Sequence, residues 1–193
     1  MIPTNLAVEH VRPKEHVPNL ELEWENFLLA CSNCNSCKGH TDVQLHDYVW
    51  PHLDNTLLAF IQGQGGVVEV SDQLSEEVML KAASTLRLVG LDKRPGHPDL
   101  SRRPAFSDRR WKDRLDARDE ATLALGYLQA MDDDQTRELI VTVFKRSGHF
   151  SIWFSTFAED ADMRRRLVEA WPGTAAECFD GQFEPVQRAG GAI

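Results

Sequence analysis

The fold of the N-terminal part depends on residues 7–38, which read AVEHVRPKEHVPNLELEWENFLLACSNCNSCK. The stretch begins with the pair Glu9-His10 and has Asn26 near its middle. It ends in a Cys-x-x-Cys-Asn-x-x-Lys sequence at residues 31–38. A carboxylate, a histidine, two amides and a cysteine pair are therefore concentrated in one short region.

Residue patterns in this stretch predict two extended pieces followed by a helix. The apolar residues 6–8 predict a strand that ends at Glu9-His10, and Pro13 and Pro18 exclude a regular helix from the segment that follows. Residues 20–25 alternate between apolar and acidic types, which predicts a second extended piece with its acidic residues facing outward. With a helix that starts near Cys34, the stretch becomes a ββα unit.

Length and composition are those of a water-soluble protein. The chain has 193 residues, of which 42% are hydrophobic and 26% charged, enough for a small module and a helical domain. No apolar run approaches a membrane span and no secretion signal is recognisable, so we expect a cytoplasmic protein with no membrane partner. Four cysteines, three of them within residues 31–37, favour metal binding over a disulfide framework.

Beyond residue 40 the pattern changes from strands and loops to helices. Glycines at 63, 65 and 66 predict a hairpin-like break, and Ser75 is a plausible cap for the first long helix. We expect an α+β fold that is mainly helical. It divides into an N-terminal module with a strand and loop extension (1–72), a helical domain (73–181) and a flexible tail (182–193). Further helices are expected from Ser107 to about Met131, from Asp134 to about Gly148, and from Asp160 to Trp171.

The formal net charge of −9 argues mildly against nucleic acid as a partner. The distribution of charge along the chain weakens that argument, because residues 93–118 contain nine basic and four acidic residues. This segment is either a phosphate-binding surface or a solvated helix face with i,i+4 ion pairs.

Hydrolysis of a phosphodiester needs a base for water, a divalent cation to stabilise charge and a group that holds the base in the right tautomer. His10 is suited to the first task, because the pKa of a histidine lies near neutrality. Glu9 and a neutral oxygen ligand are suited to Mg²⁺. If His10 ends a strand, its side chain and that of Glu9 point to opposite faces, and the loops must bring both to one phosphate.

These residues resemble a known family. The sequences Glu9-His10-x-x-Pro13 and Asn26-x-x-x-x-Cys31-x-x-Cys34-Asn35-x-x-Lys38 are similar to HNH endonucleases with a ββα-metal site. Within that family they are most like the branch found in bacterial anti-phage operons of the Septu and retron type. The likeness extends to later segments at 82–91, 107–111, 148–157 and 172–174.

The resemblance implies a role for each residue of the motif. His10 would be the general base, and Asn26 would orient the loop that carries it. Glu9 would be the metal carboxylate, and Asn35 would be either a second ligand for Mg²⁺ or Mn²⁺ or a phosphate contact. Contacts to DNA are expected from Lys38, Arg12, Lys14, Arg109 and Arg110.

The sequence departs from the family at its cysteines. The family usually carries a Cys-x-x-Cys pair ahead of the Glu-His strand, which completes a four-cysteine zinc site with the second pair. Cys31 and Cys34 match that second pair, and no cysteine precedes them, so the ligand set for Zn²⁺ is incomplete. We expect an N-terminally shortened form or a member without zinc.

Two functions follow from this reading. The first is a metal-dependent endonuclease that acts on DNA, an effector of an anti-phage system with an ATPase subunit as partner. The alternative is a non-catalytic, shortened HNH-like protein that binds a partner through its helical domain.

Overall fold

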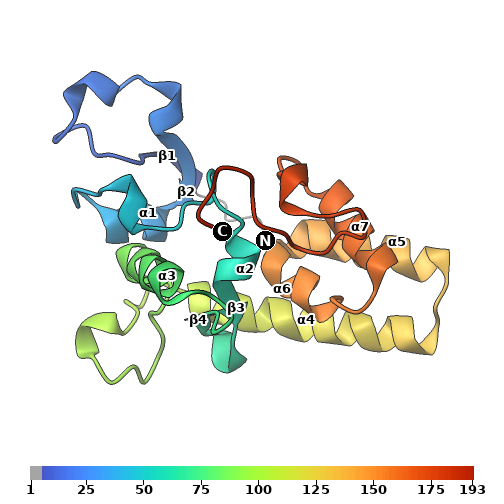
Figure 1. Ribbon diagram of the computed structural model, residues 1–193. Helices are drawn as coiled ribbons and strands as arrows, with labels where there is room; N and C mark the ends of the chain where they lie inside the picture. The colour runs from blue at the N-terminus through green and yellow to red at the C-terminus, as the bar shows by residue number, and fades with distance from the viewer. Residues whose placement is uncertain (1–5) are drawn as a thin grey trace.

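The computed structural model describes residues 6–193 and has the expected α+β, mainly helical architecture. Figure 1 shows β1, β2, α1 and α3 at one end, α4 to α7 at the other, and α2, β3 and β4 between them. The helices are α1 (Ser32–Lys38), α2 (Thr56–Ala59), α3 (Glu76–Leu88), α4 (Arg110–Ala130), α5 (Asp134–Ser147), α6 (Phe150–Thr156) and α7 (Ala161–Ala170). The strands are β1 (Leu6–His10), β2 (Phe27–Cys31), β3 (Phe60–Gln62) and β4 (Val68–Val70).

The predicted ββα unit is confirmed. β1 and β2 pair antiparallel along their full length, with Leu6 opposite Cys31 and His10 opposite Phe27. α1 begins two residues earlier than expected because Cys31 caps it: the Cys31 sulfur accepts a hydrogen bond from the backbone N–H of Cys34 at 3.4 Å. The helix ends at Gly39, whose φ of +51° favours glycine.

The expected extended piece at 20–25 is wrong. Short 3₁₀ turns form at Pro18–Leu20 and Trp24–Asn26, and β2 starts only at Phe27. The apolar members of the alternation, Leu22 and Trp24, are 87% and 81% exposed. β1 is already paired over its whole length with residues 27–31, so the alternating residues have no partner strand among the described residues.

A small antiparallel hairpin of β3 and β4 joins the module to the long helix α4. Its turn contains the predicted glycines, and Gly66 has a φ of +70°. The Gly66 carbonyl accepts a hydrogen bond from Arg114 Nε of α4 at 2.7 Å. A Cβ at Gly66 would overlap the carbonyl oxygen of Trp111, so the turn lies directly against the backbone of α4.

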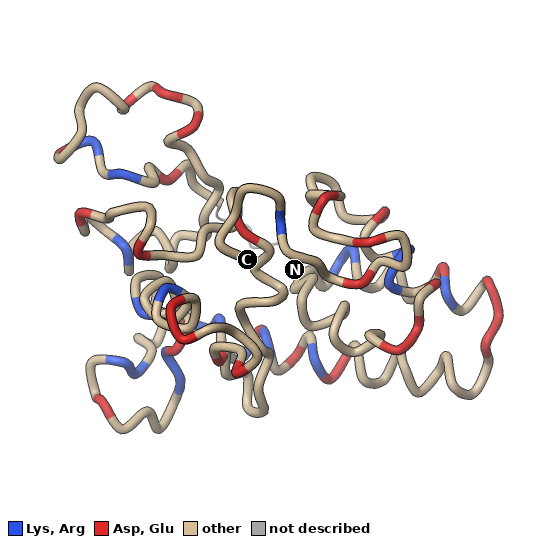
Figure 2. The backbone as a smooth tube through the Cα atoms, in the orientation of Figure 1, with Lys and Arg blue, Asp and Glu red and all other residues tan. Residues whose placement is uncertain are grey.

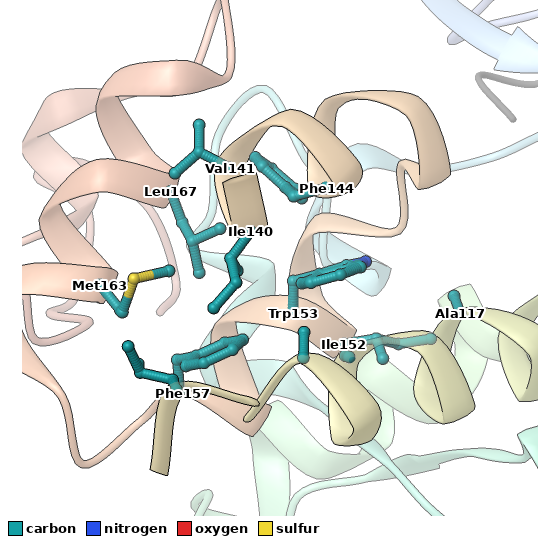
Figure 3. Packing of buried hydrophobic residues seen from close by; sticks show 12 residues of the cluster. Ala117, Ile140, Val141, Phe144, Ile152, Trp153, Phe157, Met163 and Leu167 are labelled. Carbon is teal, nitrogen blue, oxygen red and sulfur yellow. The ribbon is translucent and has the colours of Figure 1, made fainter. Parts of the chain in front are cut away.

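The helical end is built around one aromatic core. Figure 3 shows Phe144, Trp153 and Phe157 packed among Ile140, Met163 and Leu167 of neighbouring helices. The remaining members come mainly from the inner face of α4: Ala117, Ala121, Ala124, Leu128, Val141 and Ile152. Burying this apolar surface holds α4, α5, α6 and α7 together.

Helix ends follow the capping rules, with small shifts from the expected positions. Ser75 caps α3 as predicted, through a hydrogen bond from the N–H of Val78. Asp133, one residue before the expected cap, caps α5, and Asp160 caps α7. α4 starts at Arg110, so Ser107 is not its cap. The residue at the cap position is Arg109, whose side chain forms no capping hydrogen bond.

The C-terminal tail differs from the flexible segment that we expect. The backbone N–H of Asn55 donates to the carbonyl of Ile193 at 2.8 Å, and Asp54 accepts from the N–H of Ala192 at 2.7 Å. The Ile193 side chain is 7% exposed and packs with Val49 and its neighbours. Figure 1 shows the tail running from α7 back to the region of α2, so it links the helical end to the middle of the molecule.

Among residues 6–193, none of the helices combines the length and the apolar character that crossing a lipid bilayer requires.

Candidate functional site

The candidate site lies where β1 ends, beside α1. Glu9 and His10 point to opposite sides of the strand, as expected. The Glu9 carboxylate turns toward α1, where Lys38 Nζ donates to its Oε1 at 2.7 Å and to the His10 carbonyl at 2.8 Å. Lys38 is 3% exposed and the Glu9 side chain 12%, so this ion pair is largely removed from water. Lys38 therefore binds two consecutive residues of β1.

The His10 ring lies on the other side, against the loop at 11–26. Its Nε2 is 2.9 Å from the carbonyl oxygen of Glu21. Because a carbonyl oxygen only accepts, Nε2 carries the proton and Nδ1 is left as the basic nitrogen when the ring is neutral. The ring also contacts Phe27 edge to face, with centroids 5.1 Å apart. Both contacts restrict the ring orientation.

Asn26 holds the loop that supplies this carbonyl. Its Oδ1 accepts from the N–H of Arg12 at 2.8 Å, and its Nδ2 donates to the carbonyls of Arg12 and Leu20, each at 3.0 Å. The side chain is 5% exposed, so these three bonds have little competition from water. Leu20 immediately precedes Glu21, and Asn26 thus fixes the segment that orients His10.

Asn35 lies on α1, three residues before Lys38. Residues three apart share one face of a helix, and Lys38 reaches Glu9 from that face. Asn35 and Lys38 therefore lie on the same face of α1.

Two of the residues expected to contact DNA sit in the same loop. Lys14 is exposed and forms an ion pair with Glu21 at 2.9 Å. Arg12 is half-buried, and its Nε has no hydrogen-bond partner among the described residues. Both belong to the loop that follows β1 and that also supplies the Glu21 carbonyl bound by His10.

Most of the basic residues between 93 and 118 are engaged inside the chain. Arg102 pairs with Asp92, Lys112 with Asp116, and the buried Arg114 bonds the Gly66 carbonyl. Figure 2 shows basic and acidic residues interspersed over the molecule. Arg109 is exposed, but the guanidinium of Arg110 is engaged with groups of this chain. Of the two expectations for residues 93–118, the structure therefore favours a helix face with ion pairs over a continuous phosphate-binding surface.

Cys31 is the last residue of β2, and Cys34 and Cys37 lie on α1. The hydrogen bond from the Cys34 thiol lowers the pKa of Cys31 to about 5. The same bond raises the pKa of Cys34, and burial acts in the same direction. Within residues 6–193, no three His, Cys, Asp or Glu side chains converge to hold a metal ion.

Sequence reasoning missed two features of this region. The Glu21 carbonyl that binds His10 belongs to the backbone, and no side-chain pattern identifies it. The second feature is a pair of contacts from residues far from the motif in sequence. Lys93 donates to Cys37 of α1, and Asp108 accepts from Arg110, which lies beside the same cysteines. The dense basic segment was the one available signal, and it suggested DNA rather than contacts within the chain.

Comparison with known proteins agrees with this geometry. Residues 2–41 match the model of the HNH endonuclease family. A stretch of 49 residues is 39% identical to "Septu protein PtuB" of Bacillus thuringiensis, and it covers 25% of this chain and 19% of that relative. No solved structure matches the chain. The N-terminal segment is therefore similar to the HNH endonuclease family.

Within that family the segment is similar to the Septu branch, although the chain matches only about a fifth of the curated relative's length.

Proposed function

We propose that this chain is a metal-dependent HNH endonuclease that hydrolyses DNA phosphodiester bonds, with His10 as general base. The observation that carries the proposal is the contact of His10 Nε2 with the Glu21 carbonyl, in a loop held by Asn26. It leaves Nδ1 as the unprotonated nitrogen of a ring whose orientation is restricted. The likeness to a Septu protein supports a role as effector in an anti-phage system, with an ATPase subunit as partner.

His10 would act on a water molecule held between its Nδ1 and the phosphate. The ring takes the proton of the attacking water, and the Glu21 carbonyl stabilises the imidazolium that results, because Nε2–H already points at it. Asn26 acts through the loop and does not touch the substrate, so it is a positioning residue.

The candidate ligands for a hard divalent cation such as Mg²⁺, which takes few protein ligands and keeps several waters, are Glu9 and Asn35. Glu9 would supply its second carboxylate oxygen, since Oε1 is held by Lys38, and Asn35 would supply an amide oxygen from α1. When bound, the cation would stabilise negative charge on the phosphate and the leaving oxygen. Lys38 keeps Glu9 in place and is a positioning residue in this arrangement.

The test is nicking of supercoiled plasmid by the full chain in Mg²⁺ or Mn²⁺, compared with His10→Ala. Loss of a general base is expected to lower the rate at least about 100-fold. His16→Ala is the matched control, because His16 is an exposed histidine of the same loop whose ring bonds the His40 carbonyl. It should retain full activity.

Metal-dependent nicking that persists unchanged in His10→Ala would refute the assignment of the base. If the parent chain shows no metal-dependent nicking, alone or with an ATPase partner, the alternative of a non-catalytic interaction protein is favoured.

A further inference from the structure

The zinc half of the HNH unit does not fit zinc in this chain. A structural zinc ion needs four ligands in tetrahedral arrangement. Cys31, Cys34 and Cys37 are the cysteines of this region, and the fourth cysteine, Cys178, is buried elsewhere and free. His40, the nearest histidine after them, is 78% exposed and pairs with Glu15 instead.

Cationic side chains lie against the sulfurs that a metal ion would use. Arg110 Nη1 is 3.1 Å from Cys34 Sγ, and Nη2 is 3.8 Å from Cys37 Sγ. Lys93 Nζ is 3.4 Å from Cys37 Sγ. A divalent cation on these sulfurs would lie within a few ångström of two positive charges and would be repelled by both.

Arg110 is held rigidly in this position. Its Nε and Nη2 form a two-pronged pair with Asp108, at 2.9 and 2.8 Å, and Asp108 is itself buried. Nη1 and Nη2 also donate to the carbonyls of Val89 and Gly90, at 2.9 and 3.1 Å. Arg110 thus joins the end of α3, the start of α4 and the cysteine face of α1.

The loop after α3 also approaches α1 closely. Gly90 has a φ of +64°, and a Cβ placed there would be 2.8 Å from Cys37 Sγ. A larger residue at 90 would therefore push α1 away from Lys93 and Arg110. The glycine allows the cations to reach the sulfurs.

We propose that Arg110, Asp108 and Lys93 form a cationic clamp on Cys34 and Cys37 that takes the place of the structural zinc ion. The clamp fastens α1 to α3 and α4 where the family uses a second cysteine pair and a metal. The folded unit is then independent of zinc, and its helical part becomes necessary for the geometry of the nuclease motif.

The first test is the zinc content of the full chain purified without added metal, measured by mass spectrometry of the elements. We expect well below one ion per chain, and an unchanged melting temperature in the presence of a zinc chelator. One zinc ion per chain, or melting that falls with the chelator, would overturn the proposal.

The second test compares Arg110→Met with Arg109→Met, its exposed neighbour on the same turn. Arg110→Met leaves Asp108 buried without its partner, so its melting temperature should fall by at least about 6 °C, while Arg109→Met should melt like the parent. Alkylation followed by peptide mass spectrometry should show Cys34 and Cys37 reacting faster in Arg110→Met only. Equal melting and equal thiol reactivity in the two variants would refute the clamp.

Lys93→Met keeps the test informative if Arg110→Met does not fold. It removes only the contact with Cys37 and leaves the pair of Arg110 and Asp108 intact. Faster alkylation of Cys37, with the rate at Cys31 unchanged, is the expected result. An unchanged rate at Cys37 would count against the clamp.

Discussion

The site depends on which atoms of two neighbouring residues are already engaged. Lys38 binds Glu9 Oε1 and the His10 carbonyl, while the Glu21 carbonyl binds His10 Nε2. One carboxylate oxygen and one ring nitrogen are left for chemistry, and they lie on opposite sides of β1. If Glu9 and His10 act as we propose, a substrate phosphate must reach the end of the strand to meet both.

Lys38→Met should weaken the response to metal more than it weakens DNA binding. Without the ammonium group, the Glu9 carboxylate loses its fixed orientation, and loss of such an outer partner typically costs about 10-fold or more in metal affinity or activity. The Mg²⁺ concentration that gives half-maximal nicking should rise accordingly, as measured by a metal titration of plasmid nicking.

Lys14→Met is the control for this prediction, because Lys14 is exposed and pairs with Glu21 rather than Glu9. Its half-maximal Mg²⁺ concentration should equal that of the parent. A parent-like titration for Lys38→Met would mean that Glu9 does not serve as the metal carboxylate or that Lys38 does not position it.

At the level of elements, the β3–β4 turn connects the module to α4. Both Gly65 and Gly66 have positive φ values, but only Gly66 lies against the backbone of α4. Substitutions at these two glycines therefore distinguish the cost of the backbone conformation from the cost of close packing. A Cβ at Gly65 would meet no atom within 4 Å.

Gly65→Ala should lower the free energy of unfolding by about 1–2 kcal/mol, the usual cost of a left-handed conformation for a residue with a Cβ. Gly66→Ala should cost about 1–3 kcal/mol more, because the new methyl group forces the turn away from Trp111 and Arg114. Urea denaturation of the two variants measures the difference. Equal losses would show that the turn is free to move on α4.

The elements of the unit were predictable where local chemistry determines them. The Glu-His strand, the prolines that end it, the cap at Ser75 and the glycine break before β4 are short-range signals, and the structure confirms them. The prediction of an extended piece at 20–25 was wrong, because an alternating pattern forms a strand only where another strand is available to pair with it. The contacts of Arg110 with α1 were not predictable, since they join residues 76 and 73 positions apart.

For the whole molecule, the tail links the helical end to the region around α2. Ile193 packs in a small core with Val49, Ala59 and Ala82, and its carbonyl receives the N–H of Asn55. Asn55 also donates from its side chain to the carbonyls of Cys178 and Val186, each at 2.8 Å. The segment at 54–55 therefore anchors the tail at several points.

Ile193→Ala should lower the free energy of unfolding by about 2 kcal/mol or more, the usual cost of removing a buried isoleucine side chain. Leu139→Ala removes an apolar side chain of similar size that is 63% exposed on α5, and it should change stability little. Thermal melting measures both. A parent-like Ile193→Ala would indicate that the tail leaves the core in solution.

The docked tail has a practical consequence for protein production. A purification tag fused after Ile193 would have to emerge from a side of the molecule where Asp54, Leu53 and Asn55 already surround the last residues. Such a tag would displace Ile193 or be shielded from its affinity resin. A flexible spacer placed before the tag would relieve both effects, and the yield with and without the spacer would report how firmly the tail is held.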